Sequence, residues 1–501
     1  MVLIVVDQLP YRLLERYDDL WTGGFRRLRD EGRSWTNLTH DHAVTETAPG
    51  HASLSTGTHP SRHGIVANGW LERDSTGWRT VENIVDGEAP LVSAPEYAGG
   101  SPERLLQPGL ADWIRQVDPD ARIASVAGKD RAAVLLAGRA TGFVYWYDAR
   151  VARFVTSAWY AARDPGWLDR VQSRVLPPLL ADSVWESTVP AGVVERARPD
   201  AAAWEGDGVH TTFPHRRDVE GSSPGLWLAR TPDLDLATLA VARAAVEELQ
   251  LGGGDRLDYL AVGLSQTDRV GHAFGPLSQE QLDNLLRLDA ALGAFLGFLE
   301  SAVPDGRLLV ALTSDHGVLD APEWRASQGL PGRRLDLDDQ RRFSDGVRGA
   351  LQGGSEPVSA LVDTLRALDW IGGAWPRETP TPDTFAVLER NAIFPGRYGS
   401  TLERYGVGYR LTEGTLDWGW PRGTQHGSPY HYDRHVPFVL WGAGLDPGLE
   451  PTAASAVDVA PTLATWMGVA VPDGLDGGPL LGRRPSAPRD SAALGGAPGA
   501  R

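Results

Sequence analysis

The sequence predicts an α/β fold in which helices flank a central, mostly parallel β-sheet. Continuous apolar runs rich in β-branched residues alternate with longer stretches of helical periodicity. Each of the first four runs leads into residues with carboxylate, hydroxyl, amine or imidazole groups. Parallel strands are buried on both faces, and ligands bind such sheets at the carboxyl ends of the strands. The fold class therefore also indicates where a functional site would lie.

Five segments have the pattern of strands in this sheet. The first, residues 2–6, is entirely apolar and leads into Asp7. The others are 122–127 (before Gly-Lys-Asp-Arg), 259–264 (before Ser-Gln-Thr-Asp), 308–312 (before Thr-Ser-Asp-His) and 436–441 (before Gly442). The clearest helical patterns are 237–251 and 279–299. Strands that alternate with such helices favour parallel pairing.

The remaining segments suggest how the chain is divided. We expect an α/β catalytic core made of residues 1–142, 234–319 and 418–484. The stretches 143–233 and 320–417 are less regular, and we expect them to be insertions that cover one face of the sheet as a lid. The tail 485–501 is rich in Gly, Ala, Pro and Ser, which predicts disorder.

Composition excludes several classes of function. The 501 residues include no cysteine, so disulfides, thiolate metal sites and cysteine nucleophiles are excluded. A net charge of −17 argues against nucleic acid as a bulk partner, although bound metal ions could still draw a phosphate to an acidic protein. No run approaches the roughly 18 apolar residues of a membrane span. Met1 leads directly into a predicted core strand, without the pattern of a signal segment.

Several polar residues have the composition of metal ligands. Asp268 and His272 are spaced so that one helical turn brings both to the same side, and Asp315 and His316 follow a strand. Taken alone, each pair is more often a surface or capping pair, Asp7 is often a helix N-cap, and His426 is an ordinary loop histidine. Together they provide nitrogen and oxygen ligands for two divalent ions, with chemistry suited to zinc. Two such ions can clamp the attacking and leaving oxygens of a phosphoryl transfer.

Thr47 is the candidate nucleophile. It lies in the sequence Thr-Glu-Thr-Ala-Pro-Gly-His, which reads as a loop that leads into a helix, and Pro49 suits the first helical turn. Backbone N–H groups at a helix N-terminus favour an anion. For an isolated threonine, a role as N-cap is the more common alternative.

These segments resemble the alkaline phosphatase superfamily, in its branch with threonine nucleophiles. The resemblance covers about residues 1–145, 255–320 and 420–480, and its motifs contain Asp7, Thr47, Asp268 with His272, Asp315 with His316, and His426, in the order of the family. It implies one zinc held by Asp7, Thr47, Asp315 and His316, and another held by Asp268, His272 and His426. It further implies a covalent phosphothreonine on Thr47, which water then hydrolyses.

Three further residues bear on the type of ester. Asn68 matches a phosphate-contacting asparagine of the family. Lys129 and Arg131 resemble the Lys-x-Arg pair of phosphate-irrepressible alkaline phosphatases, a pair that the nucleotide pyrophosphatase/phosphodiesterase relatives lack. A monoester carries more charge on its terminal oxygens than a diester, and Arg and Lys can neutralise it. In isolation, the pair would be a solvated turn after a strand.

The leading hypothesis is therefore a two-zinc alkaline phosphatase that hydrolyses small phosphate monoesters. A phosphodiesterase or nucleotide pyrophosphatase of the same superfamily is the alternative, and a non-catalytic metal-binding protein is a more remote one. A sulfatase is disfavoured because the motif Cys/Ser-x-Pro-x-Arg is absent around Thr47. The resemblance implies a periplasmic or secreted protein, whereas the absence of a signal segment leaves a cytoplasmic location open. The sequence does not indicate an oligomeric state.

Overall fold

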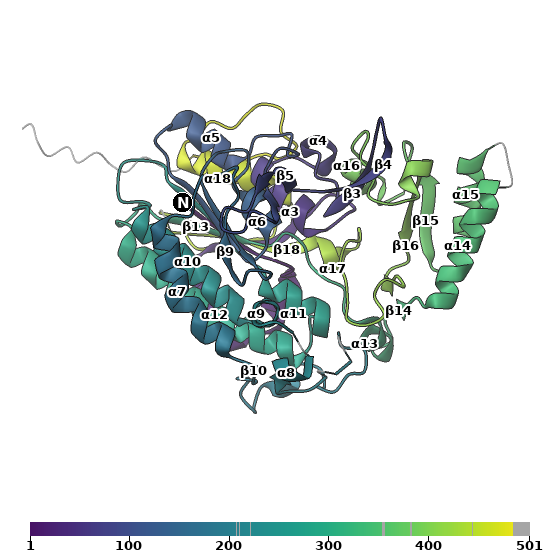
Figure 1. The fold of residues 1–501 in the computed structure, drawn as a ribbon, viewed down its shortest axis with the longest axis horizontal. Helices are drawn as coiled ribbons and strands as arrows, with labels where there is room; N and C mark the ends of the chain where they lie inside the picture. Colours follow the sequence, from purple (N-terminus) through teal and green to yellow (C-terminus); the bar gives the residue numbers. More distant parts are fainter. Residues whose placement is uncertain are drawn as a thin grey trace, which may run out of the picture.

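A computed structural model describes residues 1–483 except 207, 210, 221, 353–355, 381–382 and 443. The expected disordered tail, 485–501, lies outside the described residues. Figure 1 shows helices packed on both faces of a central sheet, with a smaller group of elements at one side. Within the described ranges, no helix has both the length and the apolar character needed to cross a membrane.

The central sheet has ten strands and is mostly parallel, as predicted. Its order is β19-β2-β18-β13-β1-β12-β7-β8-β9, and β20 pairs with β2. The five strands from β13 to β8 run parallel to one another, whereas β18 is antiparallel to both β13 and β2. The bounds are β1 (Val2–Val6), β2 (Arg33–Thr39), β7 (Ile123–Ala127), β8 (Phe143–Asp148), β9 (Arg153–Val155), β12 (Tyr259–Leu264), β13 (Leu309–Thr313), β18 (His435–Gly442), β19 (Gly448–Glu450) and β20 (Ala454–Ser455).

Strand β1 explains why the sheet has a core on both faces. All five of its residues are buried, and successive side chains point to opposite sides. Val2, Ile4 and Val6 pack in one apolar cluster with α7 (Gly166–Ala181), α10 (Asp233–Glu248) and α12 (Gln279–Ala302). Leu3 and Val5 pack in the other with α5 (Leu110–Val117) and α18 (Val459–Met467). Neither face of this strand could be solvated.

The remaining elements connect or extend these layers. The helices are α1 (Tyr11–Arg16), α2 (Gly24–Glu31), α3 (Thr47–Thr56), α4 (Pro60–His63), α6 (Asp130–Leu136), α8 (Arg217–Glu220), α9 (Pro224–Leu228), α11 (Gln266–Phe274), α13 (Pro322–Ser327), α14 (Leu337–Gln352), α15 (Pro357–Arg366), α16 (Ala386–Ala392) and α17 (His431–Arg434). The short strands are β3 (Gly69–Asp74), β4 (Gly77–Glu82), β5 (Val85–Pro90), β6 (Ala98–Gly100), β10 (Val184–Trp185), β11 (His215–Arg216), β14 (Arg333–Arg334), β15 (Ile371–Pro376), β16 (Val407–Leu411) and β17 (Thr415–Leu416). Short 3₁₀ turns cover Asp18–Leu20, Val194–Arg196, Glu403–Tyr405 and Ala456–Asp458.

All five predicted strands and both predicted helices exist, but several ends differ. The second strand begins one residue later than expected, and the expected strand 308–312 is Leu309–Thr313. The expected helix 237–251 begins at Asp233 and ends at Glu248. Asp233 and Asp235 occupy its first turn, where acidic side chains are favourable but add nothing to an apolar pattern.

The main sheet also continues past residue 142, where we expected an insertion to begin. Strands β8 and β9 are its last two strands, and α7 packs on α10 over one face. In β8, Val144 and Trp146 belong to one apolar cluster, whereas Tyr145 and Tyr147 belong to the one on the opposite face. The segment is aromatic rather than aliphatic, and aromatic residues fit a strand well.

Part of the stretch 320–417 forms a small unit, drawn in green at the right of Figure 1. Helices α14 and α15 pack together, and α15 packs on the antiparallel pair β15–β16. Its own apolar core contains Leu361, Leu365, Ala374, Leu402 and Val407. The expected division into core and lid stays a prediction.

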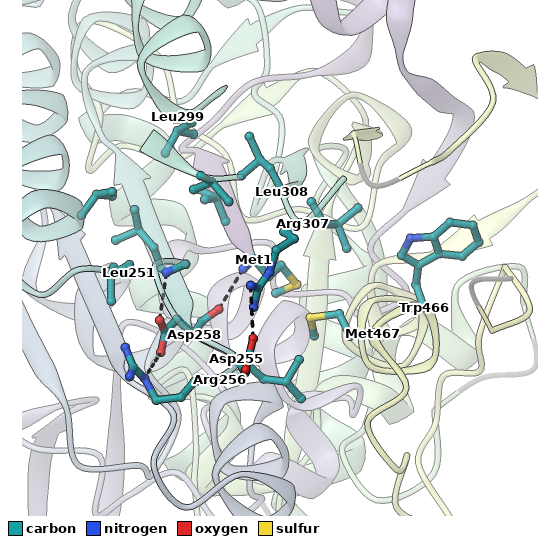
Figure 2. Close-up of a pocket in the computed structure, with 17 residues that line it drawn as sticks. Met1, Leu251, Asp255, Arg256, Asp258, Leu299, Arg307, Leu308, Trp466 and Met467 are labelled. Atoms are coloured by element: carbon teal, nitrogen blue, oxygen red, sulfur yellow. Dashed lines mark hydrogen bonds and ion pairs between the residues drawn. The ribbon is translucent and has the colours of Figure 1, made fainter. Parts of the chain in front are cut away.

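A cavity of about 240 Å³ lies at the amino end of strand β1, away from the predicted site. Figure 2 shows Met1, Asp258, Arg307 and Trp466 around it. The Met1 amino group donates a hydrogen bond to the Asp258 carbonyl (2.8 Å), and the Asp258 carboxylate accepts from the Gly252 backbone N–H (2.9 Å). None of the residues expected to carry chemistry lines this cavity.

Candidate active site

The predicted site residues converge at the carboxyl ends of the parallel strands. Asp7 follows β1, Asp315 and His316 follow β13, and Asp268 lies in α11, which begins just after β12. Lys129 follows β7, Thr47 begins α3, and His426 lies in the loop before α17. A cavity of about 340 Å³ is lined by Thr47, Asn68, Lys129, Arg131, Asp268, His272 and His426, among others. Residues spread over more than 400 positions of sequence therefore form one site.

Asp7, Asp315 and His316 form the first group with metal-ligand geometry. Their ligand atoms all lie within 4.8 Å of one another, and all three side chains are buried. His316 Nε2 is 3.7 Å from Asp7 Oδ1 and 3.4 Å from Asp315 Oδ2. Thr47 Oγ1 is 3.5 Å from the same nitrogen. The hydroxyl thus lies beside the ligand group that the resemblance assigns to it.

Asp268 is the centre of the second group. Its Oδ1 is 3.1 Å from His272 Nε2 and 3.4 Å from His426 Nε2. His316 also falls within ligand distance of Asp268 and His426, because its ring stacks on that of His426 with 3.6 Å between centroids. The two groups are therefore adjacent, and His316 lies at their boundary.

The three imidazoles all present the same nitrogen to the site. In each ring Nδ1–H donates to a backbone carbonyl: His272 to Thr424 (2.8 Å), His316 to Gly317 (3.0 Å) and His426 to Thr45 (2.7 Å). This orients each ring so that its Nε2 faces the site. Burial also lowers the pKa of His316 well below its usual value, which keeps that ring neutral. A neutral imidazole with a fixed tautomer is the form that binds a metal ion.

The charges of the site fit divalent cations. Asp7, Asp268 and Asp315 are each at most 3 % exposed, and burial, with Asp315 nearby, raises the pKa of Asp7 well above its usual value. Within the described chain, Asp7 Oδ1 accepts no hydrogen bond. Buried carboxylates are stable only when paired or bound to metal. The donor set therefore suits two divalent ions.

Lys129 brings a positive charge between the two groups. It is the only lysine in the sequence and is 5 % exposed. Its Nζ lies 2.7 Å from Asp7 Oδ2, 2.5 Å from Asp268 Oδ2 and 3.4 Å from Thr47 Oγ1. Arg131 lines the same cavity, and its Nη1 is 3.7 Å from Asp130 Oδ1. Contact of Lys129 and Arg131 with a phosphate stays a prediction.

Thr47 is the first residue of α3, and the N-cap is Glu46. Asn68 holds this end of the helix, because its Oδ1 accepts from the Ala48 N–H (2.9 Å) and its own N–H donates to Glu46 Oε2 (2.6 Å). The side-chain NH₂ of Asn68 is therefore left for the cavity that it lines. The N-cap alternative for Thr47 is wrong, and its hydroxyl is available for chemistry.

Helix α3 approaches the end of β13 closely. A Cβ added at Gly50 would lie 2.2 Å from the Asp315 carbonyl oxygen, so no larger residue fits there. The same helix contributes His51, whose Nδ1 is 2.8 Å from the Thr47 carbonyl and 3.1 Å from Asp315 Oδ2. This contact orients the Asp315 carboxylate relative to Thr47.

Two contributing residues were not predicted as part of the site. Gln8 adopts a left-handed conformation (φ 65°), and it links the two groups: its N–H donates to Asp315 Oδ1 (3.1 Å) and its Nε2 to Asp268 Oδ1 (2.9 Å). Trp420 stacks on His272, with 5.0 Å between centroids and an interplanar angle of 12°. The position of Gln8 beside Asp7 was the only signal for the first, and no pattern marked the second.

Comparison with known proteins agrees with this geometry. Residues 1–400 match the family described as type I phosphodiesterase / nucleotide pyrophosphatase. The chain is 31 % identical to the alkaline phosphatase PhoK of Sphingomonas sp., over 95 % of this chain and 90 % of that protein. It is 28 % identical to the alkaline phosphatase PafA of Elizabethkingia meningoseptica, over 95 % and 93 % of the two chains. The crystal structure of wild-type PafA superposes with a TM-score of 0.86 at 27 % identity and covers 96 % of this chain and 98 % of that one.

The family match spans most of the chain, the relatives align along nearly their whole length, and the fold agrees with that of a solved alkaline phosphatase. The chain therefore belongs to the type I phosphodiesterase / nucleotide pyrophosphatase family, within the alkaline phosphatase superfamily, and is PafA-like.

Proposed function

We propose that this protein is an alkaline phosphatase that hydrolyses small phosphate monoesters with two bound zinc ions and Thr47 as nucleophile. One observation carries the proposal: Thr47, Lys129 and the group around Asp268 line one cavity, and the group of Asp7, Asp315 and His316 lies directly beside the Thr47 hydroxyl. Relatives named alkaline phosphatases align along nearly the whole chain.

Asp7, Asp315, His316 and Thr47 would hold one zinc, and Asp268, His272 and His426 the other. When bound, the zinc ions supply the positive charge that favours an ionised hydroxyl and an anionic leaving group. The chain supplies the orientation: Gln8 links Asp268 and Asp315, and backbone carbonyls fix the three imidazoles.

In the first step, Thr47 Oγ1 attacks phosphorus while the bond from phosphorus to the leaving oxygen breaks. The hydroxyl proton is lost, and the leaving alcohol takes up a proton. Asn68, Lys129 and Arg131, which line the cavity, would hold the terminal oxygens of the phosphoryl group. In the second step, water attacks the phosphothreonine, the bond between phosphorus and Thr47 Oγ1 breaks, and inorganic phosphate leaves.

A phosphodiesterase is the second candidate, because the matching family is described by diester and pyrophosphate hydrolysis. The two functions differ in the charge on the terminal oxygens. A cavity with both an ammonium and a guanidinium suits the monoester, which carries the greater charge.

The test compares kcat/KM for p-nitrophenyl phosphate and for bis(p-nitrophenyl) phosphate. We expect the wild type to prefer the monoester. Lys129→Ala and Arg131→Ala should each lower monoester hydrolysis about 100-fold or more, and diester hydrolysis much less. Arg163→Ala, which removes an exposed arginine outside the cavity, is the matched control.

Three results would overturn the assignment. A strong diester preference of the wild type would establish the phosphodiesterase instead. Hydrolysis that persists in Thr47→Ala would show that another group attacks, whereas metal binding without hydrolysis of either ester would indicate a non-catalytic metal-binding protein.

A further inference from the structure

A second cavity, of about 350 Å³, adjoins the catalytic one. Four residues line both: Glu46, Trp420, Gln425 and His426. From this boundary the second cavity extends toward the small unit that contains β15 and β16, which contributes Trp375 and Tyr409 to its wall. The second cavity is therefore the space next to the catalytic one on the side of Trp420 and His426.

Five aromatic side chains line the second cavity: Trp375, Tyr409, Trp420, Tyr430 and Tyr432. Val44, Val66 and Ala67 add aliphatic surface. The Tyr430 hydroxyl already donates to the Leu411 carbonyl (2.7 Å), so its ring is the part that remains for a ligand. One face of Trp420 is covered by His272, and its edge lies where the two cavities meet.

Both arginines that line this cavity are paired with carboxylates. Arg410 binds Glu389 (2.6 Å), and Arg377 binds Glu403 (3.0 Å). Asp433 accepts from the Ser428 hydroxyl (2.6 Å). Each guanidinium among the described lining residues thus has a carboxylate partner, so no cation is held ready for a second anionic group.

From this lining we propose that the second cavity is a leaving-group subsite for phosphate monoesters whose leaving group is aromatic and carries no charge. The inference rests on the proposed function, because it assumes that the phosphoryl group is bound beside Thr47. The cavity exceeds the roughly 150 Å³ that suffices to hold a benzene ring. Burial of the ring against Trp375 and Tyr430 gives the binding energy, and the paired charges disfavour a leaving group with its own carboxylate or phosphate.

Phosphonates test the subsite without the complication of leaving-group reactivity. Inhibition constants of methylphosphonate, benzylphosphonate and phosphonoacetate are measured against p-nitrophenyl phosphate with the zinc-loaded enzyme. Benzylphosphonate should bind about tenfold or more tightly than methylphosphonate, and phosphonoacetate should bind no more tightly than methylphosphonate.

Substitutions in the second cavity then test whether the ring of benzylphosphonate binds there. In Tyr430→Ala and Trp375→Leu, the ratio of the methyl to the benzyl inhibition constant should fall toward one. In Tyr405→Ala, which removes an exposed ring outside both cavities, the ratio should stay at its wild-type value. Thermal unfolding of each variant identifies any that fail to fold, and in that case the wild-type ratio alone decides.

The outcomes separate the two proposals. The proposed subsite would be wrong if methylphosphonate and benzylphosphonate inhibited equally, or if phosphonoacetate inhibited more strongly than methylphosphonate. Neither result would affect the phosphatase assignment. A ratio unchanged in both folded variants would also overturn the subsite. Failure of the enzyme to hydrolyse p-nitrophenyl phosphate at all would instead overturn the proposed function.

Discussion

At the scale of single residues, Lys129 is the most constrained side chain of the site. Apart from histidines, every basic residue of the sequence except Lys129 is an arginine. This one lysine lies buried between Asp7 and Asp268. An ammonium is a compact point charge, whereas a guanidinium is larger and planar. The choice of lysine here follows from the narrow space between these two carboxylates.

We therefore expect Lys129→Arg to lower kcat/KM for p-nitrophenyl phosphate about 100-fold or more, nearly as much as Lys129→Ala. The larger group would displace one of the two carboxylates from its ligand position. Steady-state kinetics and the zinc content per chain measure both effects. Activity close to the wild-type value in Lys129→Arg would show that only the charge matters.

Asp235 gives a pH-dependent contribution to stability. Its carboxylate accepts from the backbone N–H groups of Ser265 (2.8 Å) and Gln266 (3.3 Å), at the start of α11. Burial nevertheless raises its pKa to about 7. Between about pH 4 and pH 7 the folded protein holds a proton that the unfolded chain has released. The free energy of unfolding must therefore fall as pH rises through this window, by at most about 4 kcal/mol.

Asp235→Asn removes this term because an amide does not titrate. From pH 4.5 to pH 7.5, the melting temperature of the wild type should fall relative to that of the variant. Above pH 7.5, the difference between the two melting temperatures should stay constant. Differential scanning calorimetry of both proteins, in matched buffers with zinc, provides the measurement. A difference that is independent of pH would contradict the raised pKa.

The site residues differ in how far the sequence could predict them. Five of the candidate residues come soon after a strand or lie in a loop: Asp7, Asp268, Asp315, His316 and His426. Carboxylates and imidazoles that follow a strand can be recognised in a sequence. Gln8 and Trp420 are ordinary residue types, and their contribution depends on contacts with Asp268 and His272 that no spacing reveals. The orientations of His272 and His426 likewise depend on carbonyls that are distant in sequence, those of Thr424 and Thr45.

At the scale of elements, strands that are buried on both faces were the easiest to predict. Strand β1 is continuously apolar because helices cover both sides of it. Strand β8 also has both faces covered, but aromatic residues with polar hydroxyls and an indole N–H make the same burial look irregular. The ends of helices were predicted least well, since capping residues fall outside the apolar pattern that reveals the helix.

The junction between α2 and α12 shows how one carboxylate can hold two elements together. Asp289, in α12, accepts hydrogen bonds from the backbone N–H groups of Thr22 (2.8 Å), Gly23 (2.7 Å) and Phe25 (2.7 Å). The helices also approach closely, because a Cβ at Gly24 would lie 2.3 Å from Leu292 Cβ. Asp289 is only 2 % exposed, so water cannot replace it.

Asp289→Ala should lower the free energy of unfolding by about 2 kcal/mol or more, because it removes the acceptor of the buried Phe25 N–H and of the partly buried Thr22 and Gly23 N–H groups. Chemical denaturation followed by circular dichroism measures the change. Asp305→Ala, at an exposed position after α12, is the control and should be close to neutral. The kcat of the folded Asp289→Ala protein should remain near the wild-type value, since the junction contains none of the cavity-lining residues.

At the scale of the whole molecule, the site is a concentration of negative charge in an acidic protein. Three buried carboxylates, on Asp7, Asp268 and Asp315, surround one lysine, and the net charge of the chain is −17. Bound cations should therefore stabilise the fold as well as enable hydrolysis, since a ligand that binds only the folded state raises its stability.

Chelation with EDTA should abolish hydrolysis of p-nitrophenyl phosphate and lower the melting temperature, and added zinc should restore both. Elemental analysis of the active protein should find close to two zinc ions per chain. One metal ion per chain, or full activity with magnesium alone, would contradict the two-zinc assignment.

The position of strand β18 in the sheet affects how the chain folds while it is being synthesised. This strand lies between β2 and β13, yet it follows β2 by about 400 residues. At ribosomal rates of about 5–20 residues per second, β2 would wait on the order of 20–80 s for its partner. During synthesis, the backbone hydrogen-bonding groups of β2 and its buried side chains Trp35 and Leu38 would remain exposed to other nascent chains. We therefore expect a chaperone that recognises extended segments to bind the nascent chain near residues 33–39 and to be displaced when residues 435–442 leave the ribosome.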